Sequence, residues 1–275
     1  MLKYRKLNFW LWLILLCPVV VDILALTIVL GWITNPSAFV TATGQDISPM
    51  QFNAALCFIF SSTAFLIGVS RKYPGVRISL ASITAIISIL TFIQYPLDTN
   101  FGIDTLFINP SIACSGHPGR MAPNAALAFV FISFSLMFFS SGFRLSRSRA
   151  LIISLLASIC FALGLVPLLG YMMRIETAYT WGSFTAIPIE SSICFILLSI
   201  ASIGYIWNRS ELESIWLPIP IFIAFITVTI SMSAAVYTKE LNQLNQILES
   251  NAQNVASDKL IGENAIMTAN KTLKT

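Results

Sequence analysis

A chain of 275 residues in which 56% are hydrophobic and only 10% are charged has too few polar side chains to cover a soluble domain. Soluble domains typically contain about 25% charged residues. The mean hydropathy of +0.81 agrees, and we predict an integral membrane protein. The formal charge of +4 is spread along the chain without basic clusters that alternate with aromatic residues, so we expect no nucleic-acid partner.

Seven apolar runs are long enough, or nearly so, to cross a hydrocarbon core of about 30 Å as helices. Each must be helical, because an unpaired backbone group has no water to bind in lipid. The sequence therefore predicts an all-α polytopic protein, with transmembrane helices over residues 1–237 and an outer amphipathic helix over 238–275. The predicted spans are Phe9–Trp32, Phe52–Val69, Ile78–Tyr95, Asn124–Phe143, Ala150–Met173, Ile187–Trp207 and Ile215–Val236.

The distribution of basic residues predicts the orientation of these spans. Most basic residues lie on the same side as the N-terminus, and the loops on the other side carry only Arg120 and Arg174. The positive-inside rule therefore places the N-terminus in the cytoplasm and, after seven crossings, the C-terminus outside. The basic residues on the predicted cytoplasmic side are Lys3, Arg5, Lys6, Arg71, Lys72, Arg77, Arg144, Arg147, Arg149 and Arg209.

The first span contains a carboxyl group near its middle. Asp22 follows Pro18 by four residues, and a proline inside a helix leaves a backbone carbonyl free. A charged residue at the centre of a span costs roughly 2.5–3.5 kcal/mol unless it has partners. Two interpretations stay open. Asp22 takes part in proton or ligand coupling, or it is a hydrogen-bonded residue packed against hydroxyl groups such as those of Thr84, Ser88 or Ser154.

Three spans that enter the membrane from outside begin with a similar motif. Residues 53–58 read NAALCF, residues 124–129 read NAALAF and residues 190–195 read ESSICF, each after a nearby proline. Two outer loops also share an apolar–acidic–Thr pattern, in Gly102–Leu106 and Arg174–Ala178. The motifs predict repeated helical hairpins.

The first residues of these motifs have two interpretations. They cap helices that pack closely through small residues, with Glu190 stabilised at a helix N-terminus. Alternatively, they converge on a polar pocket near the outer surface, which would bind an unknown small molecule or lipid. The candidate stimulus site then consists of Asn53, Asp104, Arg120, Asn124 and Glu190.

Residues for catalysis or metal binding do not form a recognisable pattern. The single histidine, His117, has no partner at ligand spacing, and the chain contains no C-x-x-C motif. Phosphate-binding loops and hydrolase motifs are missing from the sequence. We therefore expect no catalytic residue, metal, cofactor or disulfide, and no enzymatic activity for this chain alone. The cysteines are Cys17, Cys57, Cys114, Cys160 and Cys194.

The segment after Val236 carries apolar residues at heptad spacing. They occupy Leu241, Leu244, Leu248 and Val255, over about three heptads. Such a helix either pairs with a second copy and transmits motion along its axis, or packs against the remainder of an outer domain.

The segments 102–107 and 118–129, together with 169–171 and 179–184, resemble the MASE-like input region of bacterial sensor histidine kinases and diguanylate cyclases. The resemblance implies a multi-pass protein of the bacterial inner membrane with a periplasmic C-terminus. It also implies that the tail begins a truncated CHASE-like outer domain, and that a kinase or cyclase output domain follows outside this chain. We therefore expect a sensory input module of a two-component or related system. A small transporter or permease-like protein and a non-enzymatic membrane scaffold are the alternatives.

Overall fold

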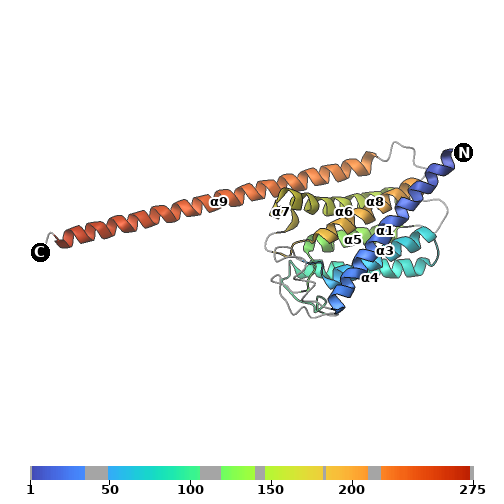
Figure 1. The fold of residues 1–275 in the computed structure, drawn as a ribbon, viewed down its shortest axis with the longest axis horizontal. Helices are drawn as coiled ribbons and strands as arrows, with labels where there is room; N and C mark the ends of the chain where they lie inside the picture. Colours follow the sequence, from blue (N-terminus) through green and yellow to red (C-terminus); the bar gives the residue numbers. More distant parts are fainter. Residues whose placement is uncertain are drawn as a thin grey trace.

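The computed structural model describes residues 2–34, 49–105, 119–139, 146–181, 184–209 and 218–272. In these residues the chain is entirely helical and contains no strand (Figure 1). The helices are α1 (Leu2–Thr34), α3 (Phe52–Ser70), α4 (Pro74–Gln94), α5 (Pro123–Met137), α6 (Arg147–Met173), α7 (Glu176–Tyr179), α8 (Ile189–Arg209) and α9 (Pro218–Thr272).

Five of the predicted spans are helices that are long and apolar enough to cross a membrane. They are Ile14–Thr34, Phe52–Ser70, Pro74–Gln94, Arg147–Met173 and Ile189–Asn208. The fourth predicted span is the shorter helix α5, which has 15 residues, and its predicted end at 140–143 lies outside the described residues. The seventh overlaps the first part of α9 from Pro218 onward and stays a prediction, and its residues 215–217 lie outside the described residues. The protein is thus membrane-embedded and all-helical in its described part.

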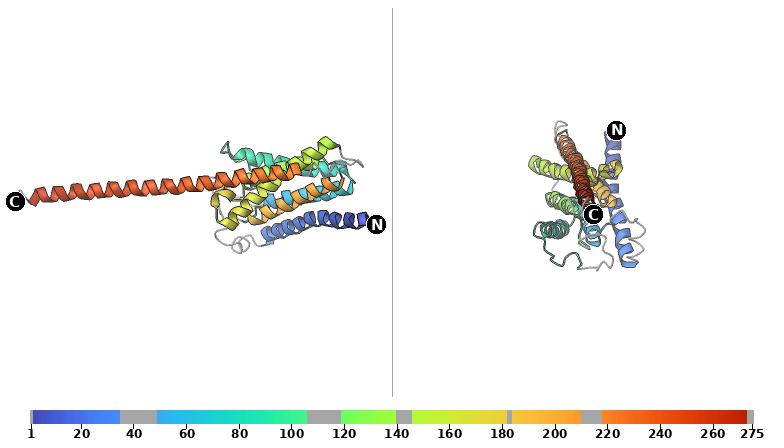
Figure 2. Two further views of the ribbon diagram at one scale, coloured as in Figure 1. Left: turned by 90° about the horizontal axis from the view of Figure 1, so that it is seen from above. Right: turned by 90° about the vertical axis from the view of Figure 1, so that its left-hand side faces the viewer.

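Neighbouring helices form a closed ring. The contacts follow the order α1, α3, α4, α5, α6 and α8, and α8 returns to α1, while α3, α5 and α8 also contact one another in the centre. Helix α9 packs outside the ring against α6 and α7. Figure 2 shows this bundle both from above and end-on.

The two ends of the bundle are identified by contacts between α4 and α5. Arg77, in the first turn of α4, donates a hydrogen bond of 2.6 Å to the carbonyl of Leu136 near the end of α5. Tyr95, directly after α4, bonds to Met121 shortly before α5. We call the end with Tyr95 the outer end and the end with Arg77 the inner end. Helix α9 runs beyond the outer end (Figure 1).

Three phenylalanines fill the centre of the ring. The ring centroids of Phe58, Phe129 and Phe195 lie 4.6, 4.7 and 4.7 Å apart in the three pairs, and all three side chains are fully buried. Each is the sixth residue of one repeated motif, so the repeat in the sequence corresponds to an approximate threefold arrangement of α3, α5 and α8. The small buried residues before them, such as Ala55, Ala126 and Ser192, allow this close approach.

Helix α9 is continuous over 55 residues, which corresponds to a length of about 80 Å. The predicted boundary between residues 237 and 238 therefore lies inside one helix. The side chains at the heptad positions are all exposed, with Leu241 at 40% and Val255 at 69%. The remaining heptad positions, Leu244 and Leu248, lie between them on this part of α9.

Candidate functional site

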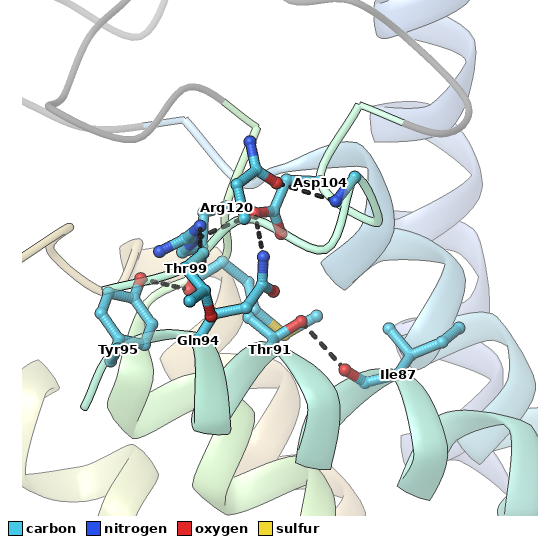
Figure 3. A network of polar contacts seen from close by, with 10 residues as sticks. Ile87, Thr91, Gln94, Tyr95, Thr99, Asp104 and Arg120 are labelled. Carbon is cyan, nitrogen blue, oxygen red and sulfur yellow. Dashed lines mark hydrogen bonds and ion pairs between the residues drawn. The ribbon is translucent and has the colours of Figure 1, made fainter. Parts of the chain in front are cut away.

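A buried ion pair lies in the connection between α4 and α5. The Nε of Arg120 donates to Oδ2 of Asp104 at 2.8 Å, and the two side chains are only 3% and 2% exposed. Arg120 also donates through a terminal nitrogen to the carbonyl of Thr99 at 2.9 Å. Both charged residues precede α5 in the chain. Their contact offsets the free-energy cost of burying two charges (Figure 3).

Gln94 and Tyr95 complete the surroundings of this pair. The Gln94 side-chain amide donates to Oδ2 of Asp104 at 3.0 Å, and the guanidinium carbon of Arg120 lies 5.3 Å from the centre of the Tyr95 ring. The Tyr95 hydroxyl donates to the carbonyl of Met121 at 2.7 Å.

Two oxygen atoms of this cluster accept no hydrogen bond from any described residue. They are Oδ1 of Asp104 and Oε1 of Gln94, and both atoms are buried. What the cluster offers chemically is therefore a pair of buried acceptors beside a neutralised charge. It holds no nucleophile or acid–base pair at catalytic geometry.

The first residues of the repeated motifs make hydrogen bonds of their own. Oδ1 of Asn53 accepts the N–H of Ala54 at 2.8 Å, and Oδ1 of Asn124 accepts the N–H of Ala125 at 3.0 Å. These bonds engage N–H groups in the first turns of α3 and α5. Both asparagines are the second residue of their helix, whereas the N-cap residues Gln51 and Ala122 make no side-chain cap bond. Glu190 occupies the same place in α8.

The described contacts join only two of the five candidate residues directly. Asp104 and Arg120 are in contact, but no hydrogen bond or ion pair within the described residues joins them to Asn53, Asn124 or Glu190. The cavity between the starts of α3, α5 and α8 has a volume of only about 10 Å³. That volume suits roughly one water molecule, so this cavity, as the described residues form it, is too small for a ligand, and the convergent interpretation stays a prediction.

Three hydrogen bonds at the outer end, which the sequence did not predict, occur at equivalent positions before the three repeated motifs. We call them the outer hydrogen bonds. Trp32 donates to the carbonyl of Met50 at 2.8 Å, and Tyr95 donates to that of Met121 at 2.7 Å. Tyr171 donates to the carbonyl of Ile187 at 2.8 Å. Each acceptor lies three residues before the first residue of a repeated motif. An aromatic side chain at the outer end of one helix thus fixes the start of the next helix three times.

Asp22 has a partner that we did not predict. The Oγ of Ser62 on α3 donates to Oδ1 of Asp22, so Thr84, Ser88 and Ser154 are not the groups that bind it. Ser62 also stands at a repeated position, because Ser133 and Ser199 follow their motifs at the same spacing and are likewise buried. The hydrogen-bonded interpretation of Asp22 accounts for this contact.

Helix α7, at the outer end of the ring, makes a hydrogen bond to α9. The Thr177 hydroxyl on α7 donates to the carbonyl of Ala235 on α9 at 2.6 Å. Tyr171 and Tyr179 stack with their ring centroids 4.0 Å apart, which holds α7 against the end of α6. Helix α9 is thus hydrogen-bonded to the segment that continues directly from α6.

Groups of three or more metal-ligand residues do not occur in the described part of the chain. Four cysteines are free and buried there, whereas Cys114 and His117 lie outside the described residues. Comparisons of the chain with protein-family models, curated proteins and solved structures find no match. The candidate site therefore rests on geometry alone: a buried ion pair, three outer hydrogen bonds and one connection to α9.

Proposed function

We propose that this chain is the membrane-embedded input module of a bacterial signal-transduction protein. A stimulus at the outer end shifts α9, and α9 passes the shift to an output domain outside this chain. The observation that carries the proposal is the continuity of α9, which begins beside the ring and extends well beyond it as one helix. The resemblance to MASE-like input regions supports the same role.

The contacts of α9 favour it as the moving element. The outer ends of the ring helices are fixed by the three outer hydrogen bonds and the Arg120–Asp104 pair. Helix α9, by contrast, contacts only α6 and α7 among the described elements. An element with few contacts responds to small free-energy changes, whereas a densely bonded ring resists them.

The output of such a module depends on a partner for the exposed heptad positions. Leu241, Leu244, Leu248 and Val255 leave an apolar stripe on α9 that a second copy of the same helix would cover. We propose a parallel homodimer through this stripe, with the bilayer surrounding the ring. In that arrangement, a rotation of α9 changes which residues face the partner.

Cysteine cross-linking in membranes tests the proposal. Single cysteines at Leu244 and Leu248 of a variant without native cysteines should cross-link between copies, and cysteines at Gln246 and Gln253 on the opposite face should not. Thr177→Val removes the hydrogen bond to Ala235 and should change the cross-linking rate at the stripe. Thr180→Val removes only the bond from Thr180, directly after α7, to the carbonyl of Glu176, and serves as the matched control.

Two results would contradict the proposal. Equal cross-linking on both faces of α9 would exclude the dimer stripe. An unchanged rate in Thr177→Val would exclude α7 as the link between the ring and α9. A solute flux in proteoliposomes would favour the transporter alternative, because an input module carries none. Stable cross-links that respond to no variant would favour a scaffold.

A further inference from the structure

A cavity of about 600 Å³ lies at the outer end, where α9 passes α6 and α7. Small-molecule sites occupy about 300–1,000 Å³, so the cavity has room for a ligand. One wall comes from α6, α7 and the residues directly after α7, and the other comes from α9 between Ser231 and Asn242. No residue of the Arg120–Asp104 cluster lines it, so this is a separate site.

Three of the hydroxyl groups that line the cavity already donate their protons to backbone carbonyls. Thr177 donates to Ala235, Thr180 donates to Glu176, and Thr238 donates to Ala234, in each case to the backbone carbonyl. A hydroxyl has one proton and two lone pairs, so a ligand would find acceptors at these positions. Although the Asn242 amide can also donate, these acceptors suit a ligand that donates hydrogen bonds or carries a positive charge.

Glu176 and Trp181 also favour a positively charged ligand in this cavity. Glu176 is the one charged residue among those that line the cavity, and an ionised carboxylate accepts hydrogen bonds only. Trp181 adds an indole ring that is 39% exposed. A tryptophan face attracts cations within about 6 Å of its centroid, most strongly when the cation is partly desolvated.

We propose that this cavity binds an ammonium cation, with the charge held by Glu176 and the indole ring of Trp181. A free amine and the amine headgroup of a lipid share this chemistry. The consequence for signalling rests on the proposed function: a ligand that touches both walls would change how α9 sits against α7. Binding itself does not depend on signalling.

Equilibrium dialysis with choline as the probe tests the site in the full chain in phosphatidylglycerol nanodiscs. We expect saturable binding that weakens about fivefold in Glu176→Gln and about two- to tenfold in Trp181→Leu. Asp98→Asn, which changes an exposed carboxylate elsewhere at the outer end, should bind like the wild type. Choline should also bind more tightly than its neutral isostere 3,3-dimethylbutanol.

Absence of saturable binding would overturn the site. Binding as tight as that of the wild type in Glu176→Gln and Trp181→Leu would also overturn it. Equal binding of the neutral isostere would overturn its preference for cations. Phosphatidylethanolamine added to the nanodiscs distinguishes a lipid headgroup from a free amine as the natural ligand. Weaker apparent choline affinity in its presence supports a lipid headgroup as the occupant, and unchanged affinity supports a free amine.

The cross-linking assay separates this inference from the proposed function. Choline binding that leaves the α9 cross-links unchanged supports the site and contradicts its control of α9. Cross-links that respond to Thr177→Val but not to choline, in a chain that does not bind choline, support the input module and overturn the ammonium site.

Discussion

At the scale of single residues, burial decides what the Arg120–Asp104 pair contributes. An exposed ion pair is worth about 0–1 kcal/mol, but these side chains are 3% and 2% exposed and have lost most of their hydration. Their attraction and the bonds from Gln94 and to Thr99 compensate for that loss. The pair is therefore more sensitive to the loss of one partner than to the loss of both.

Arg120→Ala should lower the free energy of unfolding by about 3–5 kcal/mol, because it leaves the Asp104 carboxylate buried without a counter-charge. The double variant Arg120→Met with Asp104→Leu should recover most of that loss, since it removes both charges and keeps apolar volume. Denaturant titration in detergent measures the three proteins. A double variant less stable than Arg120→Ala would contradict the argument.

The outer hydrogen bonds give a second prediction at this scale. Tyr171→Phe should destabilise the protein by about 1–3 kcal/mol, because the buried carbonyl of Ile187 loses its donor. The same substitution at Tyr73, whose side chain is 71% exposed, should change the unfolding free energy little. Thermal unfolding of the two variants in nanodiscs compares them, and equal shifts would show that Tyr171 contributes no special bond.

At the scale of elements, a glycine sets how closely α7 approaches α6. A Cβ atom at Gly170 would lie 2.6 Å from the Cβ of Ala178, which no packed structure tolerates without movement. The hydrogen bond from the N–H of Ile175 to the Gly170 carbonyl, at 2.8 Å, strengthens the same turn. The position of α7, and through Thr177 that of α9, thus depends on this small residue.

Gly170→Ala should displace α7, cost about 1–3 kcal/mol, and change the cross-linking rate along α9. Gly75→Ala is the control, because a Cβ atom there meets no atom within 4 Å, and an alanine inside a helix is slightly favourable. Stability and cross-linking of both variants are measured together. A normal cross-linking rate in Gly170→Ala would separate α7 from the movement of α9.

Elements that depend on local composition were predictable from the sequence, whereas contacts with backbone groups were not. Apolar length alone located the five long spans, whereas the contact of the three motif phenylalanines in the centre was not predicted. The outer hydrogen bonds accept at carbonyls, which every residue carries, and donor and acceptor are 18, 26 and 16 residues apart. No fixed spacing reveals such bonds. The partner of Asp22 was missed for a similar reason, since many helices carry serines.

At the scale of the whole molecule, the topology depends on whether α5 crosses the membrane. It has 15 residues and is shorter than the roughly 20 needed to span a typical core. Its start is nevertheless near Tyr95 at the outer end, and its end is near Arg77 at the inner end. A short helix that runs through the depth of the ring is compatible with a crossing, because the surrounding helices shield its ends from lipid.

Labelling from one side of the membrane distinguishes the two topologies. If α5 crosses, cysteines at Lys72 and Ser146 lie on the same side, and a membrane-impermeant maleimide applied outside intact cells labels neither. The same reagent should label a cysteine at Val255, because an odd number of crossings places the exposed part of α9 outside. If α5 does not cross, Lys72 and Ser146 are labelled from opposite sides, and Arg147 and Arg149 then lie outside. That distribution would violate the positive-inside rule on which the orientation rests.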